Sequence, residues 1–513
     1  MSVSIATGVS ALDILNPSTA AAVVGAAGGN GLKTRIVGYG DSLTLYNNFY
    51  AVPTSIVRVG GVSTVTVSQN SATGSKFCMT GNTPASFNAN GVAVTRLSAT
   101  TFSYVNAGPD ESATAFGHTT NLGFFTNISP FLYANSALNG ALQWVKNFGV
   151  GGQTSAQILS RISDVLAVGP TGSGEADECW VTAGANDATS GVTSAAYAEN
   201  MRAIVLALKN AGFVVRVIGV APFASGHPTL ATVQSLVVQY NAWLRRNIAS
   251  LGGVFVDAFS VLTDSSNANG AAVSGLINAT DYTHYTHMGA RLVGDKIAAS
   301  YESAVAASAS ALILSRNDSY ATSPLMPNIH PFDLGSSSGG TISDVVSGTA
   351  MDGLNISSSG NAGRTAVASV VSANSGIGNA QQVVFTPAAS GDTLTVQQET
   401  GGTMAARVVP GERYQFKTYI KLSGATGANL QYIRNRIQGT FDAVSGIQIG
   451  GINNTYTTTD FDGDDTLILI SPPVVIPPFS ACTALTSEII LGFSAVGTAL
   501  TVQVERVSMD RIS

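Results

Sequence analysis

The sequence is poor in charged residues. Asp, Glu, Lys and Arg make up 11% of the 513 residues, against about 25% in an average soluble protein. The net charge is −6 and the chain contains no Lys/Arg run, which argues against a nucleic-acid partner. The abundance of Gly, Ala, Ser, Thr and Val instead favours β-rich structure with tight turns and a neutral, hydroxyl-rich surface.

Cysteines and long apolar runs are also scarce. The three cysteines, Cys78, Cys179 and Cys482, are far apart and odd in number, which predicts buried free thiols rather than disulfides or a zinc site. No apolar run reaches the length of about 18 residues that a transmembrane helix needs, so membrane insertion is not expected. The first basic residue is Lys33, and a secretory signal needs a positive segment earlier; we therefore expect synthesis in the cytoplasm without a signal peptide.

Strand and helix patterns alternate over residues 35–54 and 112–310. Short apolar strands are followed by longer segments whose apolar residues recur at three- and four-residue spacing. The strands are RIVGYG, LQWVKNFG, ADECWVTAG, VVRVIGVAP and GVFVDAF. This alternation predicts an α/β domain with a flavodoxin-like parallel five-stranded sheet and helices on both faces, which binds ligands at the carboxyl ends of its strands. We expect one of the helices to run unbroken over 154–168.

Two β-rich segments and an arm complete the expected organisation. Residues 55–111 alternate polar and apolar side chains, which predicts a small all-β domain inserted into the α/β domain. The TVTV, TG and TTFSY elements of this segment resemble a small β module of phage and phage-like proteins. Residues 320–513 predict a C-terminal β-sandwich, in which VVPGERYQFKTYIKLSG and ALTVQVERVSMDRI resemble carbohydrate-binding jelly-roll modules. Residues 1–34 are expected to form an N-terminal arm.

Four short blocks, each at the end of an expected strand, contain the residues with catalytic potential. They are GDSL at 40–43, GGQT at 151–154, GAND at 184–187 and DYTH at 281–284. Each block alone has an ordinary explanation, since Gly-Asp-Ser forms turns and an Asp before a surface His can cap a helix. All four in this order, at one edge of one sheet, instead favour a common site.

The blocks supply what acyl transfer needs. Ser42 is the candidate nucleophile, and it requires a base such as His284 to take its proton. Asp281 stands three residues before His284, close enough to fix the imidazole tautomer. Candidate donors to the developing oxyanion are the backbone N–H groups of Ser42 and Gly152 and the side-chain amide of Asn186.

These blocks resemble those of the GDSL/SGNH hydrolases, a family of serine esterases, over roughly 35–54 and 112–306. The resemblance implies the SGNH hydrolase fold and a reaction that needs no metal or organic cofactor. It assigns the family's Ser, Gly, Asn and His positions and its triad Asp to Ser42, Gly152, Asn186, His284 and Asp281. The long gap between the first two blocks departs from the usual pattern, and Gly151 remains an alternative to Gly152.

Other reactive side chains have simpler explanations. We expect His287 to cap or pack at the start of the last helix, and Asp41 and Asp187 to hold their loops by accepting backbone N–H bonds. The DFDGDD segment at 460–465 leaves two alternatives, a calcium loop and a solvated turn, of which we favour the turn.

Three histidines and three aromatic residues are also assigned structural roles. His118, His227 and His330 lack recognisable partners in the sequence. Of Tyr414, Phe416 and Tyr419, we expect two to face the core, although these rings could instead stack on sugars.

Together the resemblances predict a carboxylic ester hydrolase that removes O-acetyl groups from a polysaccharide of the capsule or O-antigen type. The expected setting is a phage tail spike or another virion, acting outside the cell and trimeric if it is a tail spike. A lipase or general carboxylesterase, with an exposed apolar groove, is one alternative. A catalytically inactive receptor-binding virion protein is another. The sugar, the hydroxyl that carries the ester and the acyl length stay open.

Overall fold

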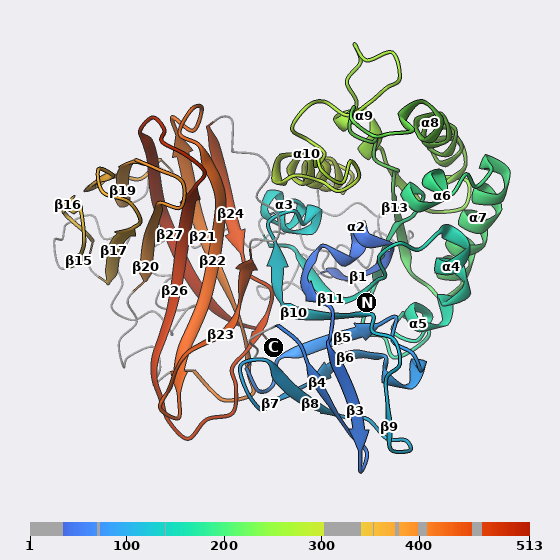
Figure 1. The fold of residues 1–513 in the computed structure, drawn as a ribbon, viewed down its shortest axis with the longest axis horizontal. Coiled ribbons are helices and arrows are strands. Elements are labelled where there is room, and N and C mark those ends of the chain that lie inside the picture. Colours follow the sequence, from blue (N-terminus) through green and yellow to red (C-terminus); the bar gives the residue numbers. More distant parts are fainter. Residues whose placement is uncertain are drawn as a thin grey trace, which may run out of the picture.

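The computed structural model describes residues 34–68, 72–138, 140–301, 340–351, 353–374, 379–398, 408–453 and 464–512. The expected N-terminal arm, apart from Thr34, therefore lies outside the described residues, as does His330. Figure 1 shows an α/β domain, a small β unit below it, and a large C-terminal β region beside both.

The α/β domain is built on a parallel five-stranded sheet, as predicted. In order across the sheet, its strands are β11 (Leu142–Gly149), β1 (Thr34–Gly40), β12 (Glu178–Thr182), β13 (Val214–Ile218) and β14 (Val254–Val256). In chain order this is 2-1-3-4-5, so the connection after β1 runs to one side, to β11, and the connection after the neighbouring β12 runs to the other side, to β13. Such a switch point creates a crevice at the carboxyl ends of the strands, where ligands bind in sheets of this kind.

Helices cover both faces of this sheet because its strands are apolar on both sides. On β1, Ile36 faces one core and Val37 and Tyr39 face the other. The helices on the Ile36 side are α3 (Pro130–Ala137), α9 (Ala258–Leu262) and α10 (His287–Ala298). Those on the other side are α4 (Ser155–Ser160), α5 (Ile162–Leu166), α7 (Ser194–Asn210) and α8 (Leu230–Asn247). Two short helices follow strands at the crevice, α2 (Ser42–Leu45) and α6 (Ala185–Thr189).

The prediction of a single helix over 154–168 is wrong, because this segment forms two separate helices, α4 and α5. The break falls at Arg161, whose backbone leaves the helical region with φ −113° and ψ 24°. Its guanidinium instead donates to the carbonyl oxygens of Gly40, at 2.6 Å, and Phe148, at 2.7 Å. These long-range bonds outweigh the local helical pattern of the segment.

The segment over 55–111 contributes strands to two sheets. A separate five-stranded sheet contains, in spatial order, β7 (Thr95–Arg96), β8 (Thr101–Val105), β4 (Val62–Thr66), β3 (Ser55–Val59) and β9 (Glu111–Ser112). The other two strands, β5 (Lys76–Thr80) and β6 (Ala89–Ala93), join a much larger sheet through β10 (His118–Thr126). Phe77 on β5 nevertheless packs with Phe102 on β8, so the two groups of strands share a small core.

The C-terminal region consists of two large sheets. One is the ten-stranded sheet that also holds β2 (Asn48–Ala51), β5, β6 and β10; its C-terminal strands are β15 (Thr341–Ile342), β17 (Leu354–Ser359), β20 (Thr393–Gln398), β26 (Cys482–Phe493), β22 (Leu430–Phe441) and β23 (Val444–Asn453). The other contains β16 (Val346–Gly348), β18 (Thr365–Ser372), β19 (Asn379–Thr386), β27 (Leu500–Ile512), β21 (Arg413–Ser423), β24 (Asp465–Ile470) and β25 (Val474–Val475). Phe385 of one sheet stacks on Phe493 of the other, with ring centroids 4.8 Å apart. The sheets therefore pack face to face; a jelly-roll topology stays a prediction.

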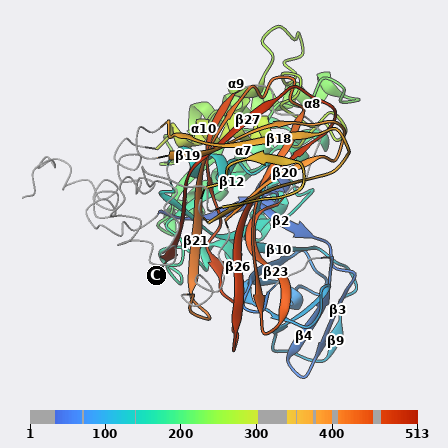
Figure 2. The same ribbon diagram turned by 90° about the vertical axis from the view of Figure 1, so that its left-hand side faces the viewer.

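The C-terminal region is joined to the rest of the chain by backbone pairing with β10 and by packing against the α/β domain. Strands β10 and β23 pair in parallel, with Phe124 opposite Gly451. Helix α3 lies between α10 and β24, and the N–H of Ile468 donates to the Ser136 hydroxyl at 3.0 Å. Viewed from the side of the C-terminal strands, the α/β helices lie behind these strands and the small β unit lies below (Figure 2).

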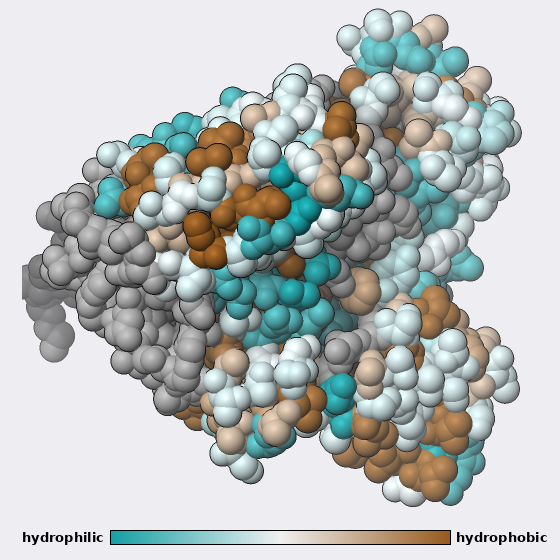
Figure 3. Space-filling model, turned by 60° about the vertical axis from the view of Figure 1, so that its left-hand side comes forward, coloured by the Kyte–Doolittle hydropathy of each residue, from teal (hydrophilic) through white to brown (hydrophobic). Residues whose placement is uncertain are grey.

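Several side-chain expectations can be compared with these elements. Cys78 and Cys179 are buried free thiols, whereas Cys482 is partly exposed. Tyr414 and Phe416 are buried and Tyr419 is half-buried, so two of the three rings face the core as predicted. Where Figure 3 is coloured, pale and teal residues are interspersed with separate brown, hydrophobic patches.

The candidate calcium segment is described only at its end. Residues 460–463 lie outside the described residues. Asp464 accepts the backbone N–H groups of Gly424 and Ala425, and Asp465 forms an ion pair with Arg291. Within the described ranges, no group of three or more His, Cys, Asp or Glu side chains is arranged to hold a metal ion.

Candidate active site

Ser42 lies at the carboxyl end of β1, where the chain turns sharply into α2. Asp41 is the N-cap of this helix and accepts the N–H of Leu43 at 3.0 Å, which satisfies a donor that the helix itself cannot. Gly40 is required at the turn because a Cβ atom there would collide with the carbonyl of Thr182 on β12. The local sequence thus holds the serine at the switch point of the sheet.

His284 and Asp281 lie on the loop that leads into α10. Asp281 Oδ1 accepts the backbone N–H groups of Thr283, at 2.9 Å, and His284, at 3.0 Å, while its Oδ2 lies 2.9 Å from His284 Nδ1. The buried Asn278 holds the loop from below, since its N–H donates to the His284 carbonyl at 2.8 Å and its carbonyl accepts the N–H of Tyr282. Tyr282 adopts a left-handed backbone conformation, with φ +63°.

The fold brings this loop to Ser42. His284 Nε2 lies 2.8 Å from Ser42 Oγ, although 242 residues separate the two. The Asp281 and His284 side chains are 30% and 16% exposed, so a substrate can reach the pair from solvent. Ser42, His284 and Asp281 form one continuous hydrogen-bonded chain, which is the geometry that activates a serine hydroxyl.

Hydrogen bonds keep the Asp281 carboxylate ionised. Burial raises its pKa, but the hydrogen bonds from the side chain and backbone of His284 and from the N–H of Thr283 lower it more, so its pKa lies below the usual range. The carboxylate is therefore available to stabilise a positive imidazole over the whole neutral range.

Asp41 has the opposite environment. Its complete burial raises its pKa to about 6, although bonds from Leu43 and Thr182 oppose that shift. The expected role of Asp41, holding its loop, is confirmed by the bond from Leu43. The same is true of Asp187, which accepts the Ser155 N–H at 2.8 Å and the Ser155 hydroxyl at 2.5 Å.

Two of the candidate oxyanion donors lie on neighbouring loops at the same edge of the sheet. Asn186, in α6 after β12, donates one amide hydrogen to the carbonyl of Gln153 at 3.0 Å. An amide has a second hydrogen, which this bond leaves for another acceptor. Gly152 has φ +78°, and a Cβ there would meet open space, whereas one at Gly151 would contact His118. The choice between the two glycines stays open.

Sequence reasoning missed the residue that ties these loops together. Besides binding the carbonyls that precede Ser42 and the glycine loop, Arg161 donates from Nε to Gln153 Oε1 at 2.6 Å. It also lies over the ring of Tyr39, 4.9 Å from the ring centroid. An arginine within an apparently regular amphipathic helix carries no local signal of this role, because its partners come from two other strands.

A row of aromatic rings beside the nucleophile was also missed. Tyr46, directly after α2, packs on His284 with ring centroids 4.5 Å apart. Tyr50 stacks on Tyr46 at 5.0 Å, and His118 meets the edge of Tyr50 at 5.2 Å. His118 was expected to be merely structural, but it stands between this row and Gly151.

The remaining histidines behave more simply. His287 is buried as the first residue of α10, while Thr286 caps this helix by accepting the N–H of Gly289 at 3.2 Å. Burial lowers the pKa of His287 to about 4. His287 thus packs rather than caps. His227 lies against the rings of Phe223 and Tyr282.

Comparison with known proteins assigns a family to this site. Residues 112–292 match the family described as GDSL-like Lipase/Acylhydrolase. The chain carries a GDSL-like hydrolase domain. The matched segment contains Asn186, Asp281 and His284, and it begins after Ser42, which the fold adds to the hydrolase site. The activity class is therefore that of an acylhydrolase or esterase.

Solved structures similar to the chain include several of this type. A putative lipolytic protein of the G-D-S-L family from Desulfitobacterium hafniense is 15% identical, over 52% of this chain and 99% of its own, with a TM-score of 0.31. An acetylxylan esterase from Geobacillus stearothermophilus is 16% identical, over 52% and 95%, with a TM-score of 0.30. A structure of carbohydrate-binding modules from the β-sandwich superfamily is 16% identical, over 31% and 57%, with a TM-score of 0.23. Likeness at this level says nothing about substrate.

A search among curated proteins found no match to the chain. None of the helices in the described ranges is both long and apolar enough to cross a membrane.

Proposed function

We propose that the hydrolase domain is a serine esterase that removes O-acetyl groups from a polysaccharide, with Ser42 as nucleophile, His284 as base and Asp281 as the residue that orients His284. The contact that carries this proposal is the 2.8 Å separation of Ser42 Oγ from His284 Nε2. The 2.9 Å contact of Asp281 with His284 Nδ1 supports it, because it leaves Nε2 as the proton acceptor.

In the first half of the reaction, Ser42 Oγ attacks the acetyl carbonyl carbon while His284 Nε2 takes the hydroxyl proton. The carbonyl oxygen becomes an oxyanion, for which the Ser42 and Gly152 N–H groups and the Asn186 amide are the proposed donors. The tetrahedral intermediate then collapses, the bond to the sugar oxygen breaks, and His284 returns its proton to this oxygen. The products of this half are a free sugar hydroxyl and an acetyl group on Ser42.

In the second half, water replaces the sugar. His284 takes a proton from the water as its oxygen attacks the acetyl carbonyl, and the same donors stabilise the second oxyanion. Collapse of this intermediate releases acetate, and the proton on His284 returns to Ser42 Oγ. Each step uses only groups of this chain, the ester and water.

The substrate class rests on the rest of the molecule. The chain is low in charge and rich in Ser and Thr, and a β-sandwich packs directly against the hydrolase domain. Both features suit a neutral, hydroxyl-rich polymer better than an anionic nucleic acid. The virion setting and a trimeric assembly stay predictions.

The test is acetate release, measured separately from a small ester and from polymers. The full chain is given p-nitrophenyl acetate and a panel of O-acetylated capsules, O-antigens and acetylated xylan, with Ser42→Ala and the exposed-loop control Ser265→Ala alongside. We expect release from the small ester and from at least one polymer, loss of both in Ser42→Ala, and no change in Ser265→Ala.

The orienting role of Asp281 is tested in the same assay. Asp281→Asn keeps a group of the same size but no longer favours the productive imidazole tautomer, so kcat should fall by about 10⁴. Release from the small ester alone would refute the polysaccharide substrate. Full activity in Ser42→Ala would refute the triad.

A further inference from the structure

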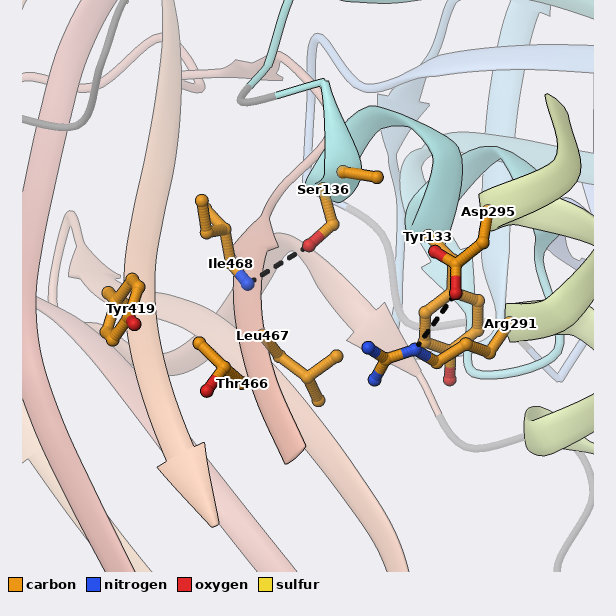
Figure 4. A pocket seen from close by; sticks show the side chains of 9 residues that line it. Tyr133, Ser136, Arg291, Asp295, Tyr419, Thr466, Leu467 and Ile468 are labelled. Carbon is orange, nitrogen blue, oxygen red and sulfur yellow. Dashed lines mark hydrogen bonds and ion pairs between the residues drawn. The ribbon is translucent and has the colours of Figure 1, made fainter. Parts of the chain in front are cut away.

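A cavity of about 200 Å³ lies between the hydrolase domain and the C-terminal β region, apart from the triad (Figure 4). One wall comes from α3 and α10, and the opposite wall from β21 and β24. Its lining side chains are those of Tyr133, Ser136, Ala137, Arg291, Asp295 and Tyr419, with Thr466, Leu467 and Ile468. Ligand sites occur preferentially at such boundaries between domains.

The polar groups of the cavity are suited to binding hydroxyl groups. The Ser136 oxygen accepts the N–H of Ile468, so its own hydrogen stays available as a donor. Thr466 is exposed and offers a second hydroxyl. Tyr419 is half-buried, and its hydroxyl is a third polar group of the lining. Figure 4 shows Ser136 on α3 and Thr466 and Tyr419 on the strands beside it.

The charges of the cavity argue against an anionic ligand. Arg291 is the cation of the lining, and it is held by two carboxylates, with Nε 3.5 Å from Asp295 Oδ2 and an ion pair to Asp465. Arg291 is thus neutralised by Asp295 in the lining and by Asp465 just outside it, so the lining offers a phosphate or carboxylate no uncompensated positive charge. The Asp295 side chain is 48% exposed and can still accept hydrogen bonds from a neutral ligand.

The apolar groups favour a ring with a hydrocarbon face. The Tyr419 ring and the side chains of Leu467 and Ile468 stand beside the polar groups, and Tyr419 lies directly opposite Ile468 in the sheet. A β-bulge against β27 follows Tyr419, and such bulges redirect side chains. The volume equals that of about seven liquid waters, less than the roughly 300–1,000 Å³ of sites for larger ligands.

A small ligand with many hydroxyl groups, no net charge and one apolar face is a neutral sugar. We propose that this cavity binds one neutral sugar unit of a glycan chain, at a position separate from the unit that carries the ester. This inference rests on the proposed function in one respect: it takes the glycan chain that binds in the cavity to be the substrate of the esterase.

The position of the cavity fits this use. His287 begins α10 three residues after His284, and Arg291 stands about 6 Å farther along the helix axis, given a rise of 1.5 Å per residue. Arg291 in the cavity lining and His284 of the triad therefore belong to one helix and the loop that leads into it. Binding there raises the local concentration of the acetylated units near Ser42.

Binding without turnover tests the site directly. The full chain carrying Ser42→Ala is titrated with glucose, galactose, rhamnose and N-acetylglucosamine, and with saponified forms of the polysaccharide panel, by saturation-transfer NMR and calorimetry. Adding Tyr419→Ala should weaken binding of the saccharide that binds best by about tenfold, since it removes the ring face. Adding Tyr432→Ala, a partly exposed tyrosine on the other sheet, should leave that affinity unchanged.

Arg291→Gln is the second variant, because it keeps a hydrogen-bonding group while removing the charge that the two carboxylates hold. It should also weaken saccharide binding, and thermal unfolding separates this effect from a loss of folding. The proposal is overturned if no saccharide binds, if neither variant changes the affinity, or if glucuronate and inorganic phosphate compete as well as neutral sugars.

Activity separates this inference from the proposed function. In the otherwise native chain, Tyr419→Ala should raise KM for the polysaccharide about tenfold more than KM for p-nitrophenyl acetate. If the native chain hydrolyses neither ester, the proposed function fails while the binding titration still decides the cavity. If it hydrolyses both and Tyr419→Ala affects them equally, the cavity proposal fails alone.

Discussion

The phenol ring of Tyr46 packs against the imidazole of His284, with ring centroids 4.5 Å apart and planes inclined by 47°. Tyr46 directly follows α2, and its N–H donates to the carbonyl of Ser42 at 2.9 Å. The helix turn that holds the nucleophile therefore also carries the ring that supports its base. No family block includes this residue.

Replacing Tyr46 by Leu should misplace the imidazole and lower kcat by about ten- to a hundredfold with little change in KM, since small displacements of catalytic groups are costly. Tyr46→Phe should restore the activity, because the contact depends on the ring. Tyr50→Leu is the control: its ring stacks on Tyr46 one step farther from the base, and its effect should be smaller. An equal loss in Tyr46→Phe and Tyr46→Leu would refute a positioning role.

Arg161 should matter for both activity and stability, because it holds the loops of the site in place. Arg161→Lys keeps the charge but cannot serve Gly40, Phe148 and Gln153 together. We expect kcat on p-nitrophenyl acetate to fall about tenfold and the free energy of unfolding by about 2 kcal/mol. Arg202→Lys, on the half-exposed face of α7, should change neither. Unchanged kcat in Arg161→Lys would show that the loops keep their positions without it.

The shifted pKa values of Asp41 and His287 should make the free energy of unfolding depend on pH in opposite directions. The pKa of Asp41 is raised to about 6, so below pH 6 the folded state binds a proton that the unfolded chain binds only near pH 4. This makes the protein more stable as the pH falls from 6 to 4. The pKa of His287 is lowered to about 4, so the unfolded chain is protonated first, near pH 6.5, and stability is lost over the same interval.

The two effects, each about 3 kcal/mol in full, should nearly cancel in the native chain and appear separately in variants. Asp41→Asn should lose stability relative to the native chain as the pH falls from 6.5 to 4. His287→Gln should gain stability over the same range. Urea unfolding at four pH values between 4 and 7 measures both, and parallel curves for all three proteins would contradict the assignment.

At position 282, a glycine variant should be more stable than an alanine variant, which is the reverse of the usual order. Its φ of +63° is a conformation that costs a non-glycine residue about 1–2 kcal/mol. Tyr282→Gly and Tyr282→Ala both remove the ring, so they differ only in the backbone. Glycine should be the more stable by about 1 kcal/mol, whereas at an ordinary position alanine is favoured. Chemical denaturation of the pair decides this, and a more stable alanine variant would mean that the loop relaxes.

The predictions that succeeded from sequence depend on local patterns. Ser42, Asp281 and His284 each stand in a short block next to a strand, where turn and cap chemistry leave a clear signal. The fold brings their side chains together, and their catalytic roles stay predictions. The strand at Leu142–Gly149 was located with its observed bounds. The break at Arg161 was missed because its hydrogen-bond partners lie on β1 and β11, which no local pattern reveals.

The sequence by itself determined the parallel sheet and the identity of the catalytic candidates, since apolar periodicity and glycine turns act within a few residues. Only the tertiary structure decided that the 55–111 segment and the C-terminal region share strands of one sheet. Strands β5 and β6 join the C-terminal sheet through β10, whose residue Phe124 pairs with Gly451. It also decided that Tyr419 and Arg291 face one cavity. Pairing and packing between segments hundreds of residues apart depend on shape and exposed edges, which a period of two or 3.6 residues does not encode.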